Sequence, residues 1–141
     1  MKLKAFLFSA LAGSVVLVAI DGLWYSVLME NFYAANTAQP DCMRAEPDTM
    51  GIVAGQIIFA FVMAYLLNYW RERTPSAIKG FMLGAAIGVI LYPALDLMLH
   101  SQIYLITKKA MLVDIIYGIP AYGIVGMVVG WVSSLFSSKE V

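Results

Sequence analysis

Four long apolar stretches dominate this sequence and constrain its fold more than any other feature. They cover residues 5–29, 50–70, 77–99 and 112–136. A helix of about 20 apolar residues is long enough to cross the hydrocarbon core of a bilayer, which is about 30 Å thick. A membrane β-barrel would instead show alternating segments of about ten residues. The pattern therefore predicts an all-α, polytopic membrane protein, with residues 1–141 forming one four-helix bundle.

The composition agrees with a location in lipid. Hydrophobic residues make up 62% of the chain and charged residues 13%, whereas soluble domains have roughly 45–50% and about 25%. Nine basic and nine acidic residues cancel, so the chain lacks the basic stripe expected of a nucleic-acid-binding protein. We therefore expect the lipid bilayer to be its main partner, together with a second copy of the chain or another membrane protein.

The first stretch shares some features with a secretory signal. Lys2 and Lys4 provide a positive start, and residues 5–20 resemble an apolar signal core. However, the apolar run resumes after Asp21, and no small-residue cleavage site follows it. We therefore expect this segment to be retained as the first membrane helix.

The distribution of Lys and Arg predicts the orientation of the helices. With four spans, the two chain ends and the second loop share one side of the membrane. That side holds Lys2, Lys4, Arg71, Arg73, Lys79 and Lys139, whereas the other side holds Arg44, Lys108 and Lys109. Because cytoplasmic loops are enriched in Lys and Arg, both termini are predicted to be cytoplasmic.

Glycines at a spacing of four indicate close helix packing. The third stretch contains Gly80, Gly84 and Gly88, and the fourth contains Gly126 and Gly130. Small residues at this spacing allow two helix backbones to approach each other in a membrane. The spacing leaves open whether these glycines face each other within one bundle or face a neighbouring protomer.

Three aspartates lie within the predicted spans, where an ionised carboxylate costs about 2.5–3.5 kcal/mol at mid-membrane. Asp21, Asp96 and Asp114 all fall in the outer half of the bilayer in the predicted orientation, and Gln56 reaches a similar depth. Helical spacing gives these residues aromatic and polar companions, namely Trp24, Tyr25, Tyr92, His100 and Tyr117. The sequence therefore predicts a polar, acidic cluster near the outer face.

Two interpretations of this cluster are open. In the first, the carboxyl groups bond to Tyr, Trp or Gln side chains across helices and fix the bundle, although such bonds average well under about 1 kcal/mol in membranes. In the second, Asp21, Asp96 and Asp114 converge on a hydrated pocket and bind a cation or relay a proton.

The residue types required for most enzyme chemistry are scarce. Cys42 is the only cysteine and His100 the only histidine, so neither a disulfide, a Cys-x-x-Cys redox motif nor a histidine-cluster metal site is expected. The glycines lie in apolar spans rather than in phosphate-binding loops. We therefore expect no enzyme activity, no cofactor and no metal.

Two stretches resemble small four-span bacterial membrane proteins from families of unknown function. Residues 23–26 read Leu-Trp-Tyr-Ser and are followed by Phe32 and Tyr33, as in the first-helix signature of those families. Between Gly84 and Gly118, a similar order of glycines, tyrosines and aspartates occurs, but residues 96–99 lack two polar positions of the related pattern. The resemblance implies a bacterial inner-membrane protein and assigns no activity.

These observations lead to two functional hypotheses. The first is a non-enzymatic accessory or interaction subunit, whose outer polar cluster fixes helix packing or receives a partner. The alternative is a small proton- or cation-coupled transporter that uses Asp21, Asp96 and Asp114.

Overall fold

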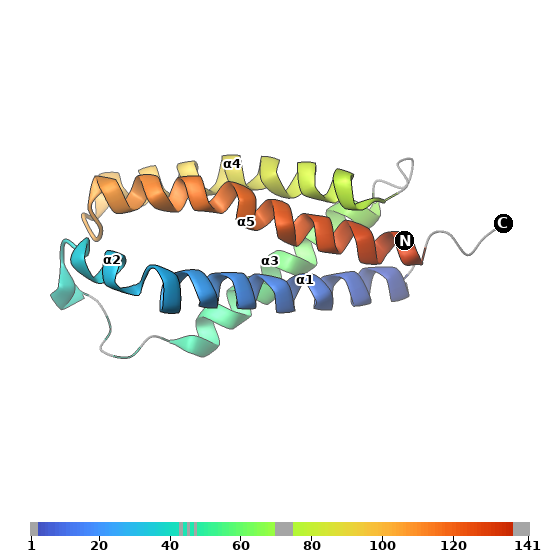
Figure 1. The fold of residues 1–141 in the computed structure, drawn as a ribbon, viewed down its shortest axis with the longest axis horizontal. Coiled ribbons are helices and arrows are strands. Elements are labelled where there is room, and N and C mark those ends of the chain that lie inside the picture. Colours follow the sequence, from blue (N-terminus) through green and yellow to red (C-terminus); the bar gives the residue numbers. More distant parts are fainter. Residues whose placement is uncertain (1–2, 43, 45, 47, 70–74, 137–141) are drawn as a thin grey trace.

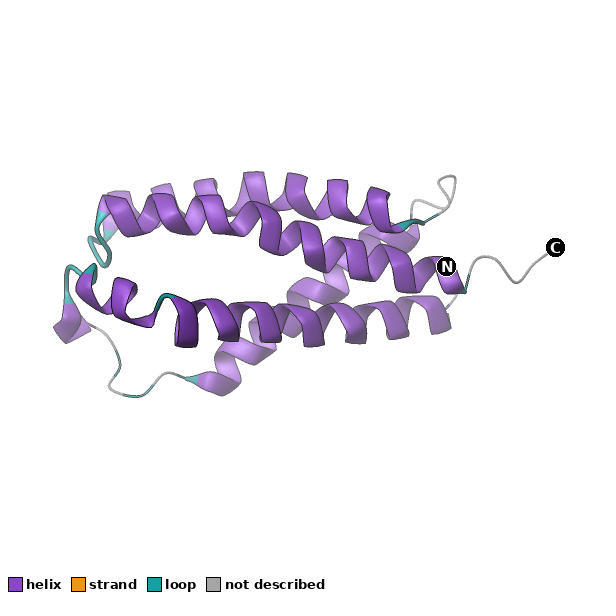
Figure 2. Ribbon diagram, viewed as in Figure 1, coloured by secondary structure: helices purple, strands orange, loops and turns teal. Residues whose placement is uncertain are grey.

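The computed structural model of the chain describes residues 3–42, 44, 46, 48–69 and 75–136. These residues form helices joined by loops, together with one isolated β-bridge (Figure 2). The helices are α1 (Leu3–Leu23), the π-helix η1 (Trp24–Leu28), α2 (Glu30–Ala35), the 3₁₀-helix η2 (Pro40–Cys42), α3 (Thr49–Tyr69), α4 (Ala77–Gln102) and α5 (Lys108–Leu135). The predicted all-α fold is confirmed.

Four helical segments are long and apolar enough to cross a membrane, as the sequence predicts. They are Leu3–Leu28, Thr49–Tyr69, Ala77–Gln102 and Lys108–Leu135. The last of them begins before the predicted start at residue 112. The reason is a local cap, because the Thr107 side chain accepts a hydrogen bond from the backbone N–H of Ala110 at 3.3 Å. Such an N-cap starts a helix before its apolar run begins.

The long helices form an open arrangement rather than a symmetric bundle. In Figure 1, α4 and α5 lie side by side, α1 runs beside α5, and α3 crosses obliquely behind them. The start of α1 and the end of α5 lie at the same end of the molecule, where the rings of Phe8 and Phe136 stack with centroids 5.5 Å apart. The opposite end, which contains η1, α2 and the loop between α4 and α5, is called the distal end below.

The central core lies among α1, α3 and α5. Leu17, Met63, Val125 and Val129 are fully buried there. Gly13 of α1 faces this core, and a Cβ atom at its position would lie only 2.6 Å from a methyl group of Val129. Because lipid tails are as apolar as these side chains, close packing rather than exclusion from water holds the helices together.

The glycines of α4 and α5 face each other within the chain. A Cβ atom added at Gly80, Gly84 or Gly88 would overlap a backbone carbonyl of α5. The reverse holds for Gly126 and Gly130, whose added Cβ atoms would overlap carbonyls at the start of α4. The two backbones are therefore in direct contact, and the glycines serve packing inside one protomer.

A polar contact joins three helices near the end where the chain begins. The Asn68 amide on α3 donates to Ser133 Oγ on α5 at 3.0 Å and lies 3.4 Å from Ser9 Oγ on α1. Both serines are fully buried, and the Asn68 amide links them to α3.

Replacing Asn68 with leucine is expected to lower the stability of the bundle by about 1 kcal/mol, because it removes two interhelical contacts and such bonds average about 0.6 kcal/mol each in a membrane. The measurement is the melting temperature of the purified protein in detergent, which should fall by a few degrees. Asn31→Leu is the control because Asn31 is exposed in α2. Equal melting temperatures for the two variants would contradict a stabilising role for Asn68.

The charge distribution that predicts the orientation is only partly described. Lys2, Arg71, Arg73 and Lys139, together with the predicted end of the second span at residue 70, lie outside the described residues.

Candidate functional site

The first of two carboxylate centres lies near the end of α1. Asp21 Oδ1 accepts a hydrogen bond from the Tyr117 hydroxyl of α5, and Asp21 Oδ2 accepts one from the Gln56 amide of α3, both at 2.7 Å. Tyr117 is 8% exposed. A single aspartate therefore joins three of the four membrane helices.

The second centre lies closer to the distal end. Asp114 Oδ1 accepts hydrogen bonds from the hydroxyls of both Tyr25 and Tyr33, each at 2.6 Å. Phenol donors at this distance from a carboxylate oxygen are strong hydrogen bonds when the acceptor is ionised. This centre ties the distal part of the first membrane segment and the short helix α2 to α5.

The π-helix η1 explains how neighbouring side chains reach both centres. Its turn is closed by a hydrogen bond of 2.8 Å from the Met29 N–H to the Trp24 carbonyl, five residues back. The Trp24 ring stacks on the Tyr117 ring, with centroids 4.3 Å apart and planes 8° from parallel. The next residue, Tyr25, reaches Asp114. Such π-helical turns occur frequently at functional sites.

Three of the predicted cluster residues lie on α4, and of these only Tyr92 is hydrogen-bonded to a centre, through the Tyr25 side chain. Asp96 Oδ2 and His100 Nδ1 are buried atoms without a hydrogen-bond partner among the described residues. The His100 ring instead contacts the Tyr104 ring, with centroids 5.1 Å apart. The Tyr92 ring packs edge-on against Tyr122 at 5.3 Å. The predicted cluster is therefore two bonded centres, with the unpartnered atoms of Asp96 and His100 beside them.

Tyr33 is a member of the site to which the sequence pattern assigns no bonding role. It lies in α2, beyond the end of the first membrane segment, and its hydroxyl also lies 3.4 Å from the indole nitrogen of Trp24. Burial of this hydroxyl, together with its hydrogen bond to Asp114, raises the pKa of Tyr33 above its usual range. Tyr33 therefore acts as a neutral hydrogen-bond donor at any physiological pH.

The donors to both carboxylates are uncharged side chains. Among the described residues, neither Asp21 nor Asp114 forms a salt bridge. Lys109, which lies five residues before Asp114 on α5, has its ammonium group over the Phe32 ring, 5.5 Å from the centroid. The two centres thus combine carboxylate oxygens with phenol and amide donors, which suits either internal bonding or the binding of a proton or small cation.

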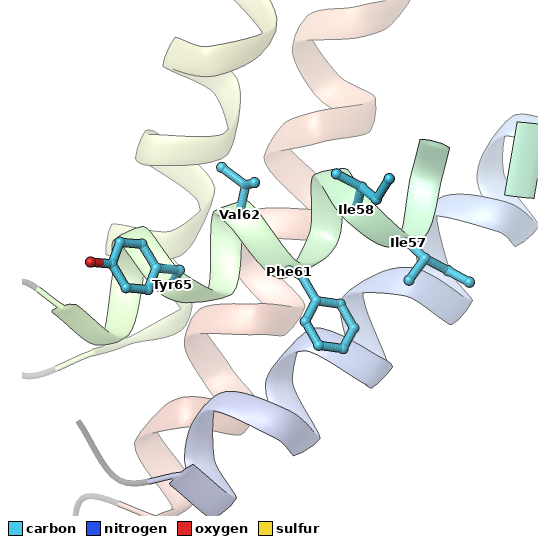
Figure 3. Close-up of a pocket in the computed structure, with 5 residues that line it drawn as sticks. All are labelled: Ile57, Ile58, Phe61, Val62 and Tyr65. Carbon is cyan, nitrogen blue, oxygen red and sulfur yellow. The ribbon is translucent and has the colours of Figure 1, made fainter. Parts of the chain in front are cut away.

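Two apolar grooves lie on the side of the molecule formed by α3. One, of about 450 Å³, runs between α3 and α4. Its lining consists of Gly55, Ile58, Phe59, Val62, Met63, Leu66, Ile87, Ile90 and Leu91. The other, of about 470 Å³, lies on α3 itself and is lined by five residues, which Figure 3 draws: Ile57, Ile58, Phe61, Val62 and Tyr65. Ile58 and Val62 line both grooves, which form one wide apolar face.

Comparison with known proteins identifies a family. The family model described as "Protein of unknown function (DUF1761)" matches residues 8–130, a range that includes every residue of both carboxylate centres. No curated protein and no solved structure matches the chain. The expected resemblance to a family of unknown function is confirmed.

Proposed function

We propose that this chain, which belongs to the DUF1761 family of proteins of unknown function, is a non-enzymatic membrane subunit that acts by associating with another membrane protein. The observation that carries the proposal is the internal bonding of the carboxylates. Asp21 and Asp114 each accept two hydrogen bonds from side chains of other helical segments. Aspartates bonded in this way hold the helices in place, and the scarcity of Cys and His argues against enzyme chemistry.

The face formed by α3 and α4 supports association within the bilayer. It contains the groove of about 450 Å³, and Ile58 and Ile90 in its lining are 65% and 66% exposed. At Gly55 an added Cβ atom would meet nothing within 4 Å. A transmembrane helix of a partner protein can approach closely at such a position, and we assign that occupant to the groove.

Photo-crosslinking in native membranes tests this assignment. A photoreactive amino acid at Ile58 should give a discrete crosslink to a partner of defined mass, which is then identified by sequencing. The same amino acid at Ile116 is the control, since Ile116 is 68% exposed on α5 and lies outside the groove. Crosslinks to lipid alone at both positions, or a product from Ile58 that contains only a second copy of this chain, would contradict a heterologous partner.

A second candidate function, a proton- or cation-coupled transporter, is favoured by the state of Asp96. Its Oδ2 atom is buried and has no partner among the described residues, unlike the oxygens of Asp21. A carboxyl group in this state is available to take up a proton or cation. Together with Asp21 and Asp114, it would provide three carboxyl groups on three membrane helices.

The variant Asp21→Asn separates the two functions. An asparagine oxygen can still accept from Tyr117, and Gln56 can rotate its amide to accept from the new NH₂ group, so the fold should be retained. If the protein is a transporter, Asp21→Asn should reduce proton flux at least tenfold in dye-loaded liposomes of phosphatidylethanolamine and phosphatidylglycerol. Asp41→Asn, in the exposed helix η2, is the control. Wild-type liposomes that leak no faster than empty ones in proton, Na⁺ and K⁺ gradients would exclude those three ions as substrates.

We propose that the chain lies in a bacterial inner membrane with both termini in the cytoplasm. The support is the excess of Lys and Arg on the side that holds the termini. In this orientation the distal end, with both carboxylate centres near it, faces the outer side of the membrane.

A further inference from the structure

The part of the chain at the distal end is held to the rest of the molecule by hydrogen bonds and aromatic contacts, without buried side chains of its own. None of residues 22–42 is buried, and α2 packs mainly on η1. We call residues 30–38, which comprise α2 and the three residues after it, the cap. Segments with few buried apolar contacts have the lowest local opening free energies in a protein.

The cap is connected to α1 through a break in the helix. At Met29 the backbone leaves the helical conformation, with φ −119° and ψ 9°, and the preceding turn is the π-helix η1. The next turn begins with a hydrogen bond of 2.9 Å from the Tyr33 N–H to the Met29 carbonyl. A single non-helical residue between a π-turn and a short helix is a position where a small change in dihedral angles reorients everything after it.

On its far side the cap is fastened by three sets of contacts. The Lys109 ammonium group of α5 lies over the Phe32 ring, 5.5 Å from its centroid. The Tyr33 hydroxyl donates to Asp114. Beyond α2, Thr37 and Ile106 form an antiparallel β-bridge, flanked by backbone hydrogen bonds of 2.8 Å from Ala38 to Leu105 and of 2.9 Å from Thr107 to Asn36. The Thr107 hydroxyl adds a bond of 2.8 Å to the Asn36 side chain. All of these contacts can open without exposing a buried apolar core.

The cap contacts the Asp114 centre directly and the Asp21 centre through Trp24. Tyr33 and Tyr25 share one oxygen of Asp114, so withdrawing the cap removes one of its two donors. The Tyr33 hydroxyl also contacts Trp24, whose ring covers Tyr117, the donor to Asp21. We therefore expect opening of the cap to increase the access of water to Asp114 and, through the contact with Trp24, to Asp21.

From this arrangement we propose that residues 30–38 form a lid that opens to admit water to the two carboxylates. The lid is hinged at η1 and Met29. It is held closed by the hydrogen bond to Asp114 and by the β-bridge between Thr37 and Ile106. The proposal is independent of the proposed function, since a lid can regulate either a partner site or a path for ions.

Two tyrosine variants test the hinge, with hydrogen–deuterium exchange in lipid nanodiscs as the readout. Tyr33→Phe removes a hydrogen bond to Asp114 from the lid side of the hinge and should increase exchange of residues 30–38 roughly fivefold, as expected for the loss of one hydrogen bond. Tyr25→Phe removes a bond of the same length to the same oxygen from within η1, outside the lid. It should change exchange in the lid less than twofold. Equal increases for the two variants would overturn the hinge.

A reversible lock tests whether the lid opens at all. The flanking hydrogen bonds make Thr37 and Ile106 a non-hydrogen-bonded antiparallel pair, whose Cα atoms approach within about 4.5 Å, so cysteines at these positions can form a disulfide. The lock is built as Thr37→Cys and Ile106→Cys in a Cys42→Ser background. In the oxidised protein, the backbone amides of residues 108–114 should exchange at least threefold more slowly than in the same protein after reduction.

Both forms of failure contradict the proposal. Identical exchange in the oxidised and reduced proteins would mean that residues 30–38 do not open. Failure of the two thiols to oxidise would contradict the bridge that holds the lid closed.

Discussion

Gly84→Leu is expected to prevent α4 from docking on α5. A Cβ atom at this position would overlap the Tyr122 carbonyl and lie 3.2 Å from the Gly126 Cα atom, and a leucine adds three more carbon atoms. The obstruction is backbone, which cannot rotate away as a side chain would. Overpacking a core costs about 1–3 kcal/mol and occasionally more, and we expect the upper part of that range or beyond. Size-exclusion chromatography in mild detergent should show aggregated or heterogeneous protein.

The matched control is Gly55→Leu on α3. A Cβ atom added at Gly55 would meet nothing within 4 Å, so this variant should elute and melt as the wild type does. A Gly84→Leu protein that elutes as a single wild-type peak would show that the backbone contact between α4 and α5 is not required for folding.

Asp21→Ala is expected to have the second largest effect, because it leaves hydrogen-bond donors on two other helices without their acceptor. The Gln56 amide and the Tyr117 hydroxyl would both lose their acceptor. A buried polar group left unpaired costs about 1–3 kcal/mol, although partners found in the membrane-inserted unfolded state reduce this cost. We expect a loss of about 2 kcal/mol, which corresponds to a fall in melting temperature of roughly 6 °C for a chain of this size.

Asp96→Ala provides the comparison, because Asp96 Oδ2 accepts no hydrogen bond from any described residue. This variant should melt within about 2 °C of the wild type. A double-mutant cycle then isolates the helix-to-helix bond, because Tyr117→Phe should destabilise the wild type but have little further effect in the Asp21→Ala protein. Additive losses would mean that Asp21 and Tyr117 stabilise the bundle independently.

The sequence predicts the four membrane helices well because their signal is local. Length and continuous hydropathy are sufficient to place a spanning helix, and only capping residues such as Thr107 shift its ends. The depth of Asp21 and Gln56 also follows from counting residues along each helix. Their hydrogen bond is consistent with the predicted similarity in depth.

The parts that could not be predicted depend on how each helix is rotated and paired. Depth alone grouped Asp96 with Asp21 and Asp114, but it does not fix the direction in which α4 presents its side chains. In the same way, glycine spacing predicts a close contact without naming the neighbour, which is α5. Tyr33 reaches Asp114 only because the chain turns at Met29 after a π-helical segment, and no periodic pattern encodes that turn.

The bare contact between α4 and α5 has an entropic consequence. Where Gly80 meets Gly126, and where Gly84 meets the carbonyl of Tyr122, there are no rotamers to immobilise when the helices meet. Long flexible side chains lose up to about 2 kcal/mol of conformational freedom when they are buried, whereas glycine side chains lose none. This seam therefore forms without the ordering penalty that interlocking side chains incur, and its strength depends on the precise fit of two main chains.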